Sequence, residues 1–483
     1  MGEQGGSRRE ELKSTLGANA DFHTGLFRIG RDEVEITWLS SVTDPQRISE
    51  RIVMPLAASA GLDPAPDTTD RLGALLRLRL PAAMLKQTDN AGTAAGLLLE
   101  GHVLLRPAAA AASTWYAVQA AAEHYRPIKE PSTQTIIRGP KEGFTESAEV
   151  AIGLLRRRIR NPQLRFEKHV LGSETATPVY IAYIAGLANE GFLKELRRRI
   201  LRFGGDSIFD SGNVEELIAD RQLTPFPLVY NSERPDSVAS HLLEGKLAVI
   251  VEGSPFVLSA PVTFQDFFQS AEDYYQPFLM ASAIRLIRYF SFMLALLLPS
   301  AYVALITFHH ELIPTEFLLS VMAQREGIPF PAFVETFIME ITFEVLREAG
   351  IRMPRAIGPT VSIVGGLVIG QAAVEAGIIS NIMVIIVALT AIASFVSPIY
   401  SMSVSTRLLR FILITLAACM GMYGVLLGLI AMVLHLTSLR SFGVPYLAPI
   451  APFKWRQLRD VFVRLPISVL KKRPRYLNPR KNE

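Results

Sequence analysis

At 483 residues the chain exceeds one ordinary domain, so two to four folding units are expected. Its single cysteine, Cys419, excludes a disulfide framework and a cysteine-cluster metal site, and its apolar surroundings predict a small buried side chain. The net charge of +4 is unevenly spread, because ten basic residues follow position 453 against only Asp460 and Glu483. The polar N-terminus lacks the apolar core of a signal peptide, so we expect the N-terminal region to stay in the cytoplasm.

The N-terminal half has the pattern of a region with mixed α and β structure. Asp44 and Pro45 have the residue types of a helix N-cap and first helical position. Period-2 alternation, buried apolar runs and helical spacing then predict strands at 33–39, 178–186 and within 246–261, and helices at 44–56, 146–160 and 190–204. The tetrapeptide LLEG precedes a β run at 98–101 and again at 242–245, but four residues alone do not favour a duplication.

The C-terminal half contains four long apolar runs. A helix of twenty residues rises about 30 Å, which matches the hydrocarbon thickness of a bilayer. The runs predict membrane spans at 289–308, 356–374, 378–400 and 411–434. Gly365, Gly366 and Gly370 put small residues on one face of the second run, which permits close helix contact.

These features predict a multi-domain integral membrane protein with an N-terminal α+β cytosolic region of two subdomains and an α-helical transmembrane domain. The Pro-rich stretch 126–140 predicts the boundary between the subdomains. The expected division is a disordered N-terminus (1–20), a first subdomain (21–128), a second subdomain (129–285), the transmembrane domain (286–453) and a basic cytosolic tail (454–483).

Two membrane topologies stay open at this stage. A cytoplasmic N-terminal region and a cytoplasmic tail require an even number of crossings, which four spans satisfy. Four arginines that flank the runs also favour the inner face: Arg352, Arg355, Arg407 and Arg410. Placing them there turns the stretch 333–350 into a fifth span, and a sixth crossing would have to come from the Pro-broken stretch 442–452, whose backbone needs burial inside protein. We favour four spans and a non-spanning helix at 333–350.

The stretch 333–350 reads FVETFIMEITFEVLREAG and carries four glutamates. At 100° per residue Glu340, Glu344 and Glu348 share one stripe, and Glu335 lies on another face. Each carboxylate facing lipid would cost roughly 2.5–3.5 kcal/mol, and an acidic face is unsuited to an anionic lipid surface. Contact with protein or with a water-filled cavity fits better, because rings of such carboxylates attract cations into pores. A purely structural amphipathic helix is the alternative.

Motifs of catalysis are absent from the sequence. It contains no GxxxxGK[ST], no GxGxxG after a strand, no GxSxG and no HExxH, so we expect no enzyme, no cofactor and no catalytic residue. The cluster His309-His310-Glu311 stands at the end of a span, where polar residues are common, so no metal site is predicted. Nucleic-acid binding is disfavoured, because the basic residues follow membrane spans directly and few aromatic residues are interleaved with them.

Several long motif blocks resemble a known family, the bacterial spore germination proteins of the GerA type, A subunit. The similarity covers roughly residues 12–478, with the blocks in the family's order. The blocks are IIRGPKEGFTE (136–146), FPLVYNSERPD (226–236), LLEGKLAVIVEGSP (242–255), EDYY (272–275), EITFEVLREAGIRMPRAIGPTVSIVGGLVIGQAAVEAGIIS (340–380) and FGVPYLAPIAP (442–452). An alanine-rich stretch at 80–113 departs from the family's pattern and puts no functional residue in doubt.

The resemblance implies a germinant receptor subunit in the inner membrane of a dormant spore, with its N-terminal domain and tail facing the spore core. The family's A subunit works with a permease-like B subunit and a lipoprotein C subunit. The resemblance implies that this subunit oligomerises, as a ring of five, into a nutrient-gated ion channel. The resemblance thereby favours a wall of the pore along 356–374, with Thr360, Ser362, Val364, Gly366 and Gln371 as candidates, and an entrance at Glu340 and Glu344.

Two other classes of function stay open. A membrane scaffold would organise partner subunits and conduct no ions. A secondary transporter would need a substrate site on broken helices near the bilayer midplane, for which Pro398 or Gln371 is a candidate position.

Overall fold

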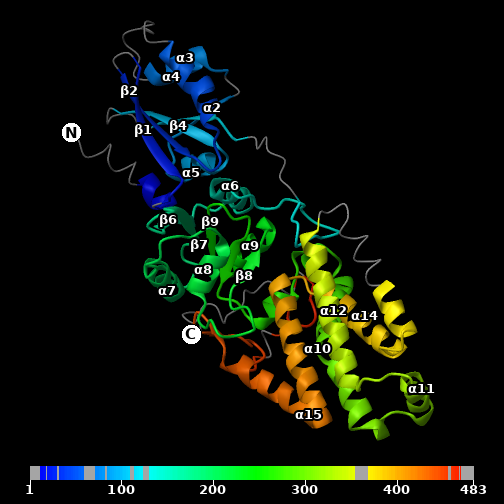
Figure 1. Cartoon of the computed structure of the whole chain (residues 1–483). Helices are drawn as coiled ribbons and strands as arrows, with labels where there is room; N and C mark the ends of the chain where they lie inside the picture. The colour runs from blue at the N-terminus through cyan, green and yellow to red at the C-terminus, as the bar shows by residue number, and fades with distance from the viewer. Residues whose placement is uncertain are drawn as a thin grey trace. The chain divides into compact units, whose positions relative to one another are not determined.

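The computed structural model describes residues 11–17, 19–29, 32–58, 71–81, 84–108, 114–122, 130–353, 368–454, 458, 460–466 and 468. The chain divides into two compact units (Figure 1). The sheet unit comprises Met1–Asp220, Val229–Pro261 and Arg473–Glu483, and the helical unit comprises Arg221–Leu228 and Val262–Lys472. Residues 11–16, which the composition assigns to a disordered N-terminus, form a helix that buries Leu12 and Leu16 in the core of the sheet unit.

The first sheet of the sheet unit is antiparallel and has the strand order β1-β2-β4-β5-β3. Successive residues of β4, such as Leu104 and Leu105, point to opposite faces of the sheet and enter different core clusters, so apolar side chains are packed on both faces. Helix α5 covers one face and α3 and α4 cover the other. The elements are β1 (Phe22–Ile29), β2 (Asp32–Leu39), α2 (Pro45–Ile48), η1 (Ser49–Val53), α3 (Met54–Ala57), α4 (Arg71–Arg79), β3 (Leu85–Thr88), α5 (Ala91–Leu99), β4 (His102–Pro107) and β5 (Trp115–Gln119).

The second sheet repeats the topology of the first. Its order is β6-β7-β9-β10-β8, so in both sheets the strands run first, second, fourth, fifth, third. The two LLEG segments lie at matching places, where α5 leads into β4 and α9 leads into β9, and Gly101 and Gly245 both have positive φ. Shared strand order and matching helix ends together support an internal repeat. The elements are α6 (Ala148–Arg158), β6 (Leu164–Leu171), β7 (Thr177–Ile184), α7 (Glu190–Leu201), α8 (Ser211–Ile218), β8 (Tyr230–Ser232), α9 (Pro235–Glu244), β9 (Leu247–Val251) and β10 (Val257–Ala260).

Most predicted elements of the sheet unit are confirmed. Strands β2, β7, β9 and β10 and helices α6 and α7 fall on the predicted stretches, and the side chain of Asp44 accepts a hydrogen bond from Gln46 N as an N-cap should. The helix predicted over 44–56 is confirmed as a continuous helical stretch, within which a π-helical turn, η1, joins α2 to α3. Helix α7 ends at Leu201, three residues before the predicted Gly204.

A histidine with a buried ring nitrogen makes the sheet unit sensitive to pH. The ring of His241 stacks edge-on against Tyr230 at 4.6 Å, and its Nδ1 is shut off from solvent. Burial lowers the pKa of His241 well below its usual 6.5, and the positive charge of Lys246 lowers it further. Below about pH 6.5 the unfolded chain therefore takes up a proton that the folded chain excludes, so the stability of the fold decreases as the pH falls.

We expect the free energy of unfolding of the full chain in detergent, measured by denaturant titration, to decrease as the pH is lowered from 7.5 to 5.5. The contribution of His241 to this slope approaches about 1.4 kcal/mol per pH unit. His241→Phe keeps a ring against Tyr230 and removes the titration, so its slope should be flatter. His102, also buried with a lowered pKa, contributes in the same direction and should keep its slope in that variant. Equal slopes for the native chain and His241→Phe would contradict the assignment.

The helical unit is built mainly from the long helices α10, α12, α14 and α15 (Figure 1). Its elements are η3 (Phe264–Phe268), η4 (Ala271–Tyr274), α10 (Phe278–Thr307), η5 (His310–Leu312), α11 (Thr315–Arg325), α12 (Ala332–Arg352), α14 (Asn381–Phe395), α15 (Tyr400–Ser438), β11 (Arg440–Ser441) and β12 (Val444–Pro445). Among the described helices, α10 and α15 are long and apolar enough to cross a membrane, and α14 is a shorter apolar helix. The runs predicted at 289–308 and 378–400 fall on α10 and α14, while most of 356–374 lies outside the described residues.

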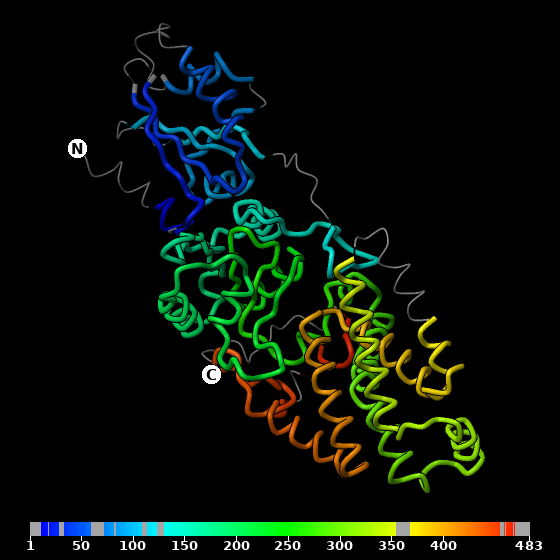
Figure 2. Tube along the Cα trace, viewed as in Figure 1, coloured from blue at the N-terminus to red at the C-terminus, as the bar shows by residue number. Residues whose placement is uncertain are grey.

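Helix α15 is two helices joined at Gly421, which has the non-helical angles φ 60° and ψ −140°. Gly424 packs against the carbonyl of Leu416, and a Cβ added at Gly428 would lie 2.5 Å from Leu413. In a straight helix residues eight positions apart are separated by about 12 Å, so these contacts require the chain to fold back on itself. Figure 2 shows this reversal in the orange part of the tube. The continuous span predicted over 411–434 is therefore wrong.

The surface of the helical unit is apolar and its interior holds polar groups. Large exposed apolar side chains occur on each long helix, among them Phe290, Val345, Ile392, Phe395 and Tyr423. Buried polar and charged side chains face inward, among them Ser300, Thr336, Glu340, Thr390 and Arg410. This is the pattern expected of a helix bundle in an apolar solvent.

Cys419 belongs to that exposed surface, and its predicted burial is wrong. The packed face of this part of α15 is formed by Leu413, Ala417 and Gly421, at helical spacing. Cys419 lies on the opposite side of the helix.

Candidate functional site

Helix α12 carries the predicted glutamates, and the structure turns two of them inward. Glu335 and Glu340 are fully buried, Glu344 is partly buried and Glu348 is exposed. The predicted helix is confirmed, as is contact of its carboxylates with protein. The apolar side is the outward one, since Ile341 and Val345 are exposed, so the helix shows apolar groups outside and carboxylates inside.

Glu335 is the centre of a cluster near the N-terminal end of α12, which we call the Glu335 cluster. One carboxylate oxygen accepts hydrogen bonds from the backbone N (2.6 Å) and the hydroxyl of Ser380, and the other pairs with Arg325 at 2.7 Å. Arg325 also donates to the hydroxyl of Tyr302 at 3.0 Å. The cluster thereby ties the ends of α10, α11 and α12 to the residue that caps α14.

A second set of charges, the inner arginine cluster, consists of Glu340, Glu344, Arg347, Arg407 and Arg410. Arg410 pairs with Glu340 at 2.8 Å, while Glu344 pairs with Arg407 and, at 3.2 Å, with Arg347. Three arginines face two carboxylates, so the cluster has one excess positive charge. Removing one partner from such a buried set leaves the other charge uncompensated in a medium of low dielectric constant.

Aromatic side chains enclose the cluster. The guanidinium of Arg347 lies over Phe343 and Phe395 at 5.1 and 5.3 Å, and it donates to the hydroxyl of Ser394. Arg407 lies over Tyr400 at 5.6 Å. Cation–π contacts and ion pairs together hold the arginines between α12, α14 and α15.

The predicted pore residues are placed unequally by the structure. Glu340 and Glu344 come together in the inner arginine cluster. Gln371 is exposed and donates to Glu375, one helical turn away, at 2.9 Å. The remaining four candidates lie outside the described residues: Thr360, Ser362, Val364 and Gly366.

The arginines that complete these clusters were missed as site residues. Arg407 and Arg410 entered the sequence analysis only as markers of membrane orientation. An available signal was the occurrence of both signs of charge in neighbouring apolar helices, because such charges must find partners inside the bundle.

His309 lies against the break in α15, with its ring 6.0 Å from that of Tyr423. A Cβ added at Gly421 would lie 2.8 Å from His309 Cε1. Within the described ranges no group of three or more possible metal-ligating side chains occurs.

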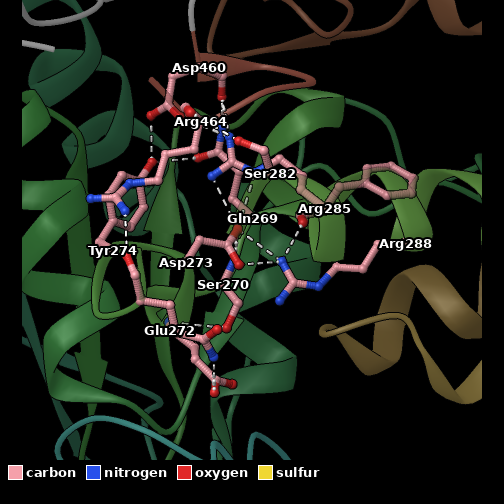
Figure 3. A network of polar contacts seen from close by, with 12 residues as sticks. Gln269, Ser270, Glu272, Asp273, Tyr274, Ser282, Arg285, Arg288, Asp460 and Arg464 are labelled. Carbon is pink, nitrogen blue, oxygen red and sulfur yellow. Dashed lines mark hydrogen bonds and ion pairs between the residues drawn. The ribbon is translucent and has the colours of Figure 1, made fainter. Parts of the chain in front are cut away.

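A third network, the α10 base network, holds the start of α10 (Figure 3). Asp273 is buried and pairs with Arg285 at 3.1 Å and Arg288 at 2.8 Å, two residues that share a face of α10. Arg285 also pairs with Asp460 at 2.8 Å, and Tyr274 donates to the same carboxylate at 2.6 Å. These contacts fasten the C-terminal segment 460–466 to the first turns of α10. The EDYY motif (272–275) supplies Asp273 and Tyr274 to this network, which its local pattern did not predict.

A family model places this sequence among known proteins. The Bacillus/Clostridium GerA spore germination protein model matches residues 10–476. The chain belongs to this family. It is 45% identical to spore germination protein KA of Bacillus subtilis (strain 168), over 96% of this chain and 85% of that protein. It is 50% identical to the uncharacterized membrane protein YfkQ of the same organism, over 72% of this chain and 68% of that protein.

A solved structure is also similar to this GerA family member. It is the crystal structure of the N-terminal domain of the A subunit of the Bacillus megaterium spore germinant receptor GerK3, with 31% identity and a TM-score of 0.41, covering 53% of this chain and 94% of that one. The resemblance carried by the motif blocks is confirmed. These names describe germination and membrane proteins, which fits the expectation that the chain is not an enzyme.

Two of the GerA motif blocks meet in the sheet unit. The carboxylate of Glu233 accepts hydrogen bonds from the backbone and hydroxyl of Ser132 at 2.6 and 3.0 Å. Arg234 pairs with Asp236 at 2.6 Å and donates to the carbonyl of Pro140. The NSERPD block thus fastens the Pro-rich stretch that contains Ser132 and Pro140 to the start of α9, which is a structural role.

Proposed function

We propose that this chain is the A subunit of a nutrient germinant receptor in bacterial spores, and that it oligomerises into a nutrient-gated ion channel. Membership of the GerA family supports the receptor role. The observation that carries the channel is the helical unit itself, whose exposed surface is apolar while paired glutamates and arginines are buried inside. Buried ionisable groups in membrane helices commonly mark ion pathways.

The assembly is part of the same proposal. The chain forms a homo-oligomer, a ring of five, in the inner spore membrane, with the sheet unit and the basic tail facing the spore core. It works with a permease-like B subunit and a lipoprotein C subunit. The family resemblance supports these partners, and the ten basic residues of the tail support its orientation.

The pore is lined by the stretch 356–374, with Thr360, Ser362, Val364, Gly366 and Gln371 on its wall and Glu340 and Glu344 at its entrance. Because both glutamates are paired with arginines, their role is to offset positive charge. Changing either one to glutamine would raise the excess charge of the inner arginine cluster from one to two. Cations passing nearby would then meet a more repulsive field.

We expect Glu340→Gln and Glu344→Gln to lower the permeability of cations relative to anions, measured as a shift in reversal potential of the purified oligomer in planar bilayers. Glu348→Gln is the matched control, because Glu348 is exposed and pairs with Arg352, one turn away on the same helix. Unchanged selectivity in both variants would remove the glutamates from the pathway. Absence of flux from the native oligomer would favour a scaffold, and saturable substrate binding by the isolated chain would favour a transporter.

A further inference from the structure

We infer that α15 crosses the membrane twice, so that the chain passes through it six times and the break at Gly421 lies on the face opposite to the N-terminus and tail. This inference rests on the membrane location given under the proposed function, and its test does not depend on ion conduction. Its starting point is the conflict in the sequence between an even number of crossings and an inner position for the flanking arginines. A sixth crossing that comes from α15 satisfies both conditions.

The two limbs of α15 have the lengths of membrane spans. The first limb, 400–420, extends about 31 Å and the second, 422–438, about 25 Å, at 1.5 Å per residue. The large exposed side chains of both limbs are apolar, including Ile412 on the first and Leu426, Ile430 and Leu434 on the second. Each limb therefore meets the requirement for a lipid-facing helix.

The far ends of the limbs meet at one place. Ser405, near the start of the first limb, donates to the carbonyl of Pro225. His435, near the end of the second limb, lies 3.0 Å from the hydroxyl of Thr224. Ser405 lies sixteen residues before the break and His435 lies fourteen residues after it, and adjacent residues of one segment contact both. The first limb therefore starts on the same side on which the second limb ends. The break at Gly421 is the opposite end of this hairpin.

The other helix ends sort into the same two groups. At the end that holds the break, the last turn of α10 meets Gly421 through Phe308 and His309. Tyr302 of α10 then leads, through Arg325, to the Glu335 cluster at the start of α12. The ends of α12 and α14 and the start of α15 meet in the inner arginine cluster. Helices α10, α12 and α14 and the two limbs of α15 thus run between one outer and one inner end, which makes five crossings. The remaining crossing is the span predicted at 356–374, because α12 ends in the inner arginine cluster while α14 starts at the Glu335 cluster.

The charges of the connecting segments agree with this arrangement. The outer segment between α10 and α12 carries Glu311, Glu316 and Glu326 against the single Arg325. The inner end holds Arg285, Arg288, Arg352, Arg407 and Arg410, together with the basic tail. An excess of arginine and lysine on the cytoplasmic side is the strongest general determinant of membrane orientation. The six-pass path places all of these residues on that side without using the Pro-broken stretch 442–452.

The inference orders the charge clusters along the proposed ion pathway. The Glu335 cluster lies toward the outer face and the inner arginine cluster toward the spore core. Glu335 and Glu344 are nine residues apart on α12, a rise of about 14 Å. Helix α12 itself crosses the membrane, in contrast to the non-spanning helix favoured from the sequence, because its outward face is apolar and its carboxylates are paired inside.

The single native cysteine makes the test direct. Cys419 is exposed and lies two residues before Gly421. The full chain is placed in sealed vesicles of either orientation and treated with a membrane-impermeant maleimide. Two cysteine variants in a Cys419→Ser background calibrate the faces: Gly327→Cys, in the exposed outer segment, and Ser207→Cys, exposed in the sheet unit. A third variant, Tyr423→Cys in the same background, reports the other side of the break.

We expect the maleimide to label Cys419 and Tyr423→Cys in vesicles of the orientation that exposes Gly327→Cys. In vesicles of the orientation that exposes Ser207→Cys, we expect neither to be labelled. Reaction of Cys419 together with Ser207→Cys would overturn the inference. The inference would also be overturned if Cys419 and Tyr423→Cys were both unreactive in both vesicle orientations but fully labelled after denaturation. That result would describe a hairpin that ends within the bilayer. If the labelling is as expected but the chain conducts no ions, the six-pass topology is supported and the proposed channel function is contradicted.

Discussion

Replacing Asp273 by alanine is expected to lower the stability of the helical unit by about 3–5 kcal/mol, because it leaves two buried arginines without a shared counter-charge. The carboxylate of Asp273 is almost completely buried and contacts both Arg285 and Arg288. It also accepts a hydrogen bond from the backbone N of Ser270, so it closes the short turn η4 at the same time. Asp460 still pairs with Arg285 in the variant, whereas Arg288 loses the ion pair that it makes within the part of the chain that the structure describes.

The measurement is the thermal midpoint of the full chain in detergent. A loss of this size corresponds to roughly 6–20 °C for a unit of this size. Glu272→Ala is the matched control, because the neighbouring Glu272 is less buried and accepts a hydrogen bond from the uncharged Gln276. Release of the C-terminal segment should accompany the loss and should appear as faster proteolysis after Lys454. Equal midpoints for the two variants would show that the α10 base network does not hold the helix.

Local patterns predicted much of the fold. The alternation of apolar and polar residues over 33–39 predicted β2, because side chains in a strand point to opposite faces in turn. The continuous apolar run at 178–186 predicted β7. The helical wheel of 333–350 placed Glu340 and Glu344 on one stripe, and the structure brings them into one cluster. These features depend on residues close together in the chain, where spacing alone determines which side chains share a face.

Partners that are distant in the sequence could not be predicted. Glu344 pairs with Arg407, which is 63 residues away. Arg285 pairs with Asp460, which is farther away still. Nothing in the spacing of either stretch specifies which helix it will face. The shared strand order of the two sheets was also out of reach, since it rests on pairing between strands, while the only sequence trace of it was the short LLEG match.

The break in α15 was missed for a different reason. Residues 411–434 form an uninterrupted apolar run with no proline and no charge, which is the pattern of one continuous span. Reversal of a helix requires a residue that can leave the helical backbone conformation, and it does not require a polar or proline-containing turn. A glycine with a backbone conformation closed to other residues is sufficient, and the run contains three glycines that all lie at or near the break: Gly421, Gly424 and Gly428.

The second large effect is expected at this glycine. Gly421→Ala would place a Cβ 2.8 Å from both Phe308 and His309, and would force a residue with a side chain into φ 60° and ψ −140°. A strained backbone conformation of this kind costs roughly 1–3 kcal/mol, and the overlap adds to that cost. The two limbs should separate, since a straight helix removes both penalties. We therefore expect a lower thermal midpoint and loss of the one-sided labelling of Cys419.

A double substitution separates the two penalties. His309→Ala removes one of the overlapping side chains, so Gly421→Ala combined with His309→Ala should recover part of the midpoint, while the strain from the positive φ remains. Gly327→Ala is the control for alanine substitution as such, because no atom lies within 4 Å of an added Cβ at that position and its φ is not positive. If Gly421→Ala matched Gly327→Ala in midpoint and labelling, α15 would tolerate a side chain at the break, and the hairpin would lose its physical basis.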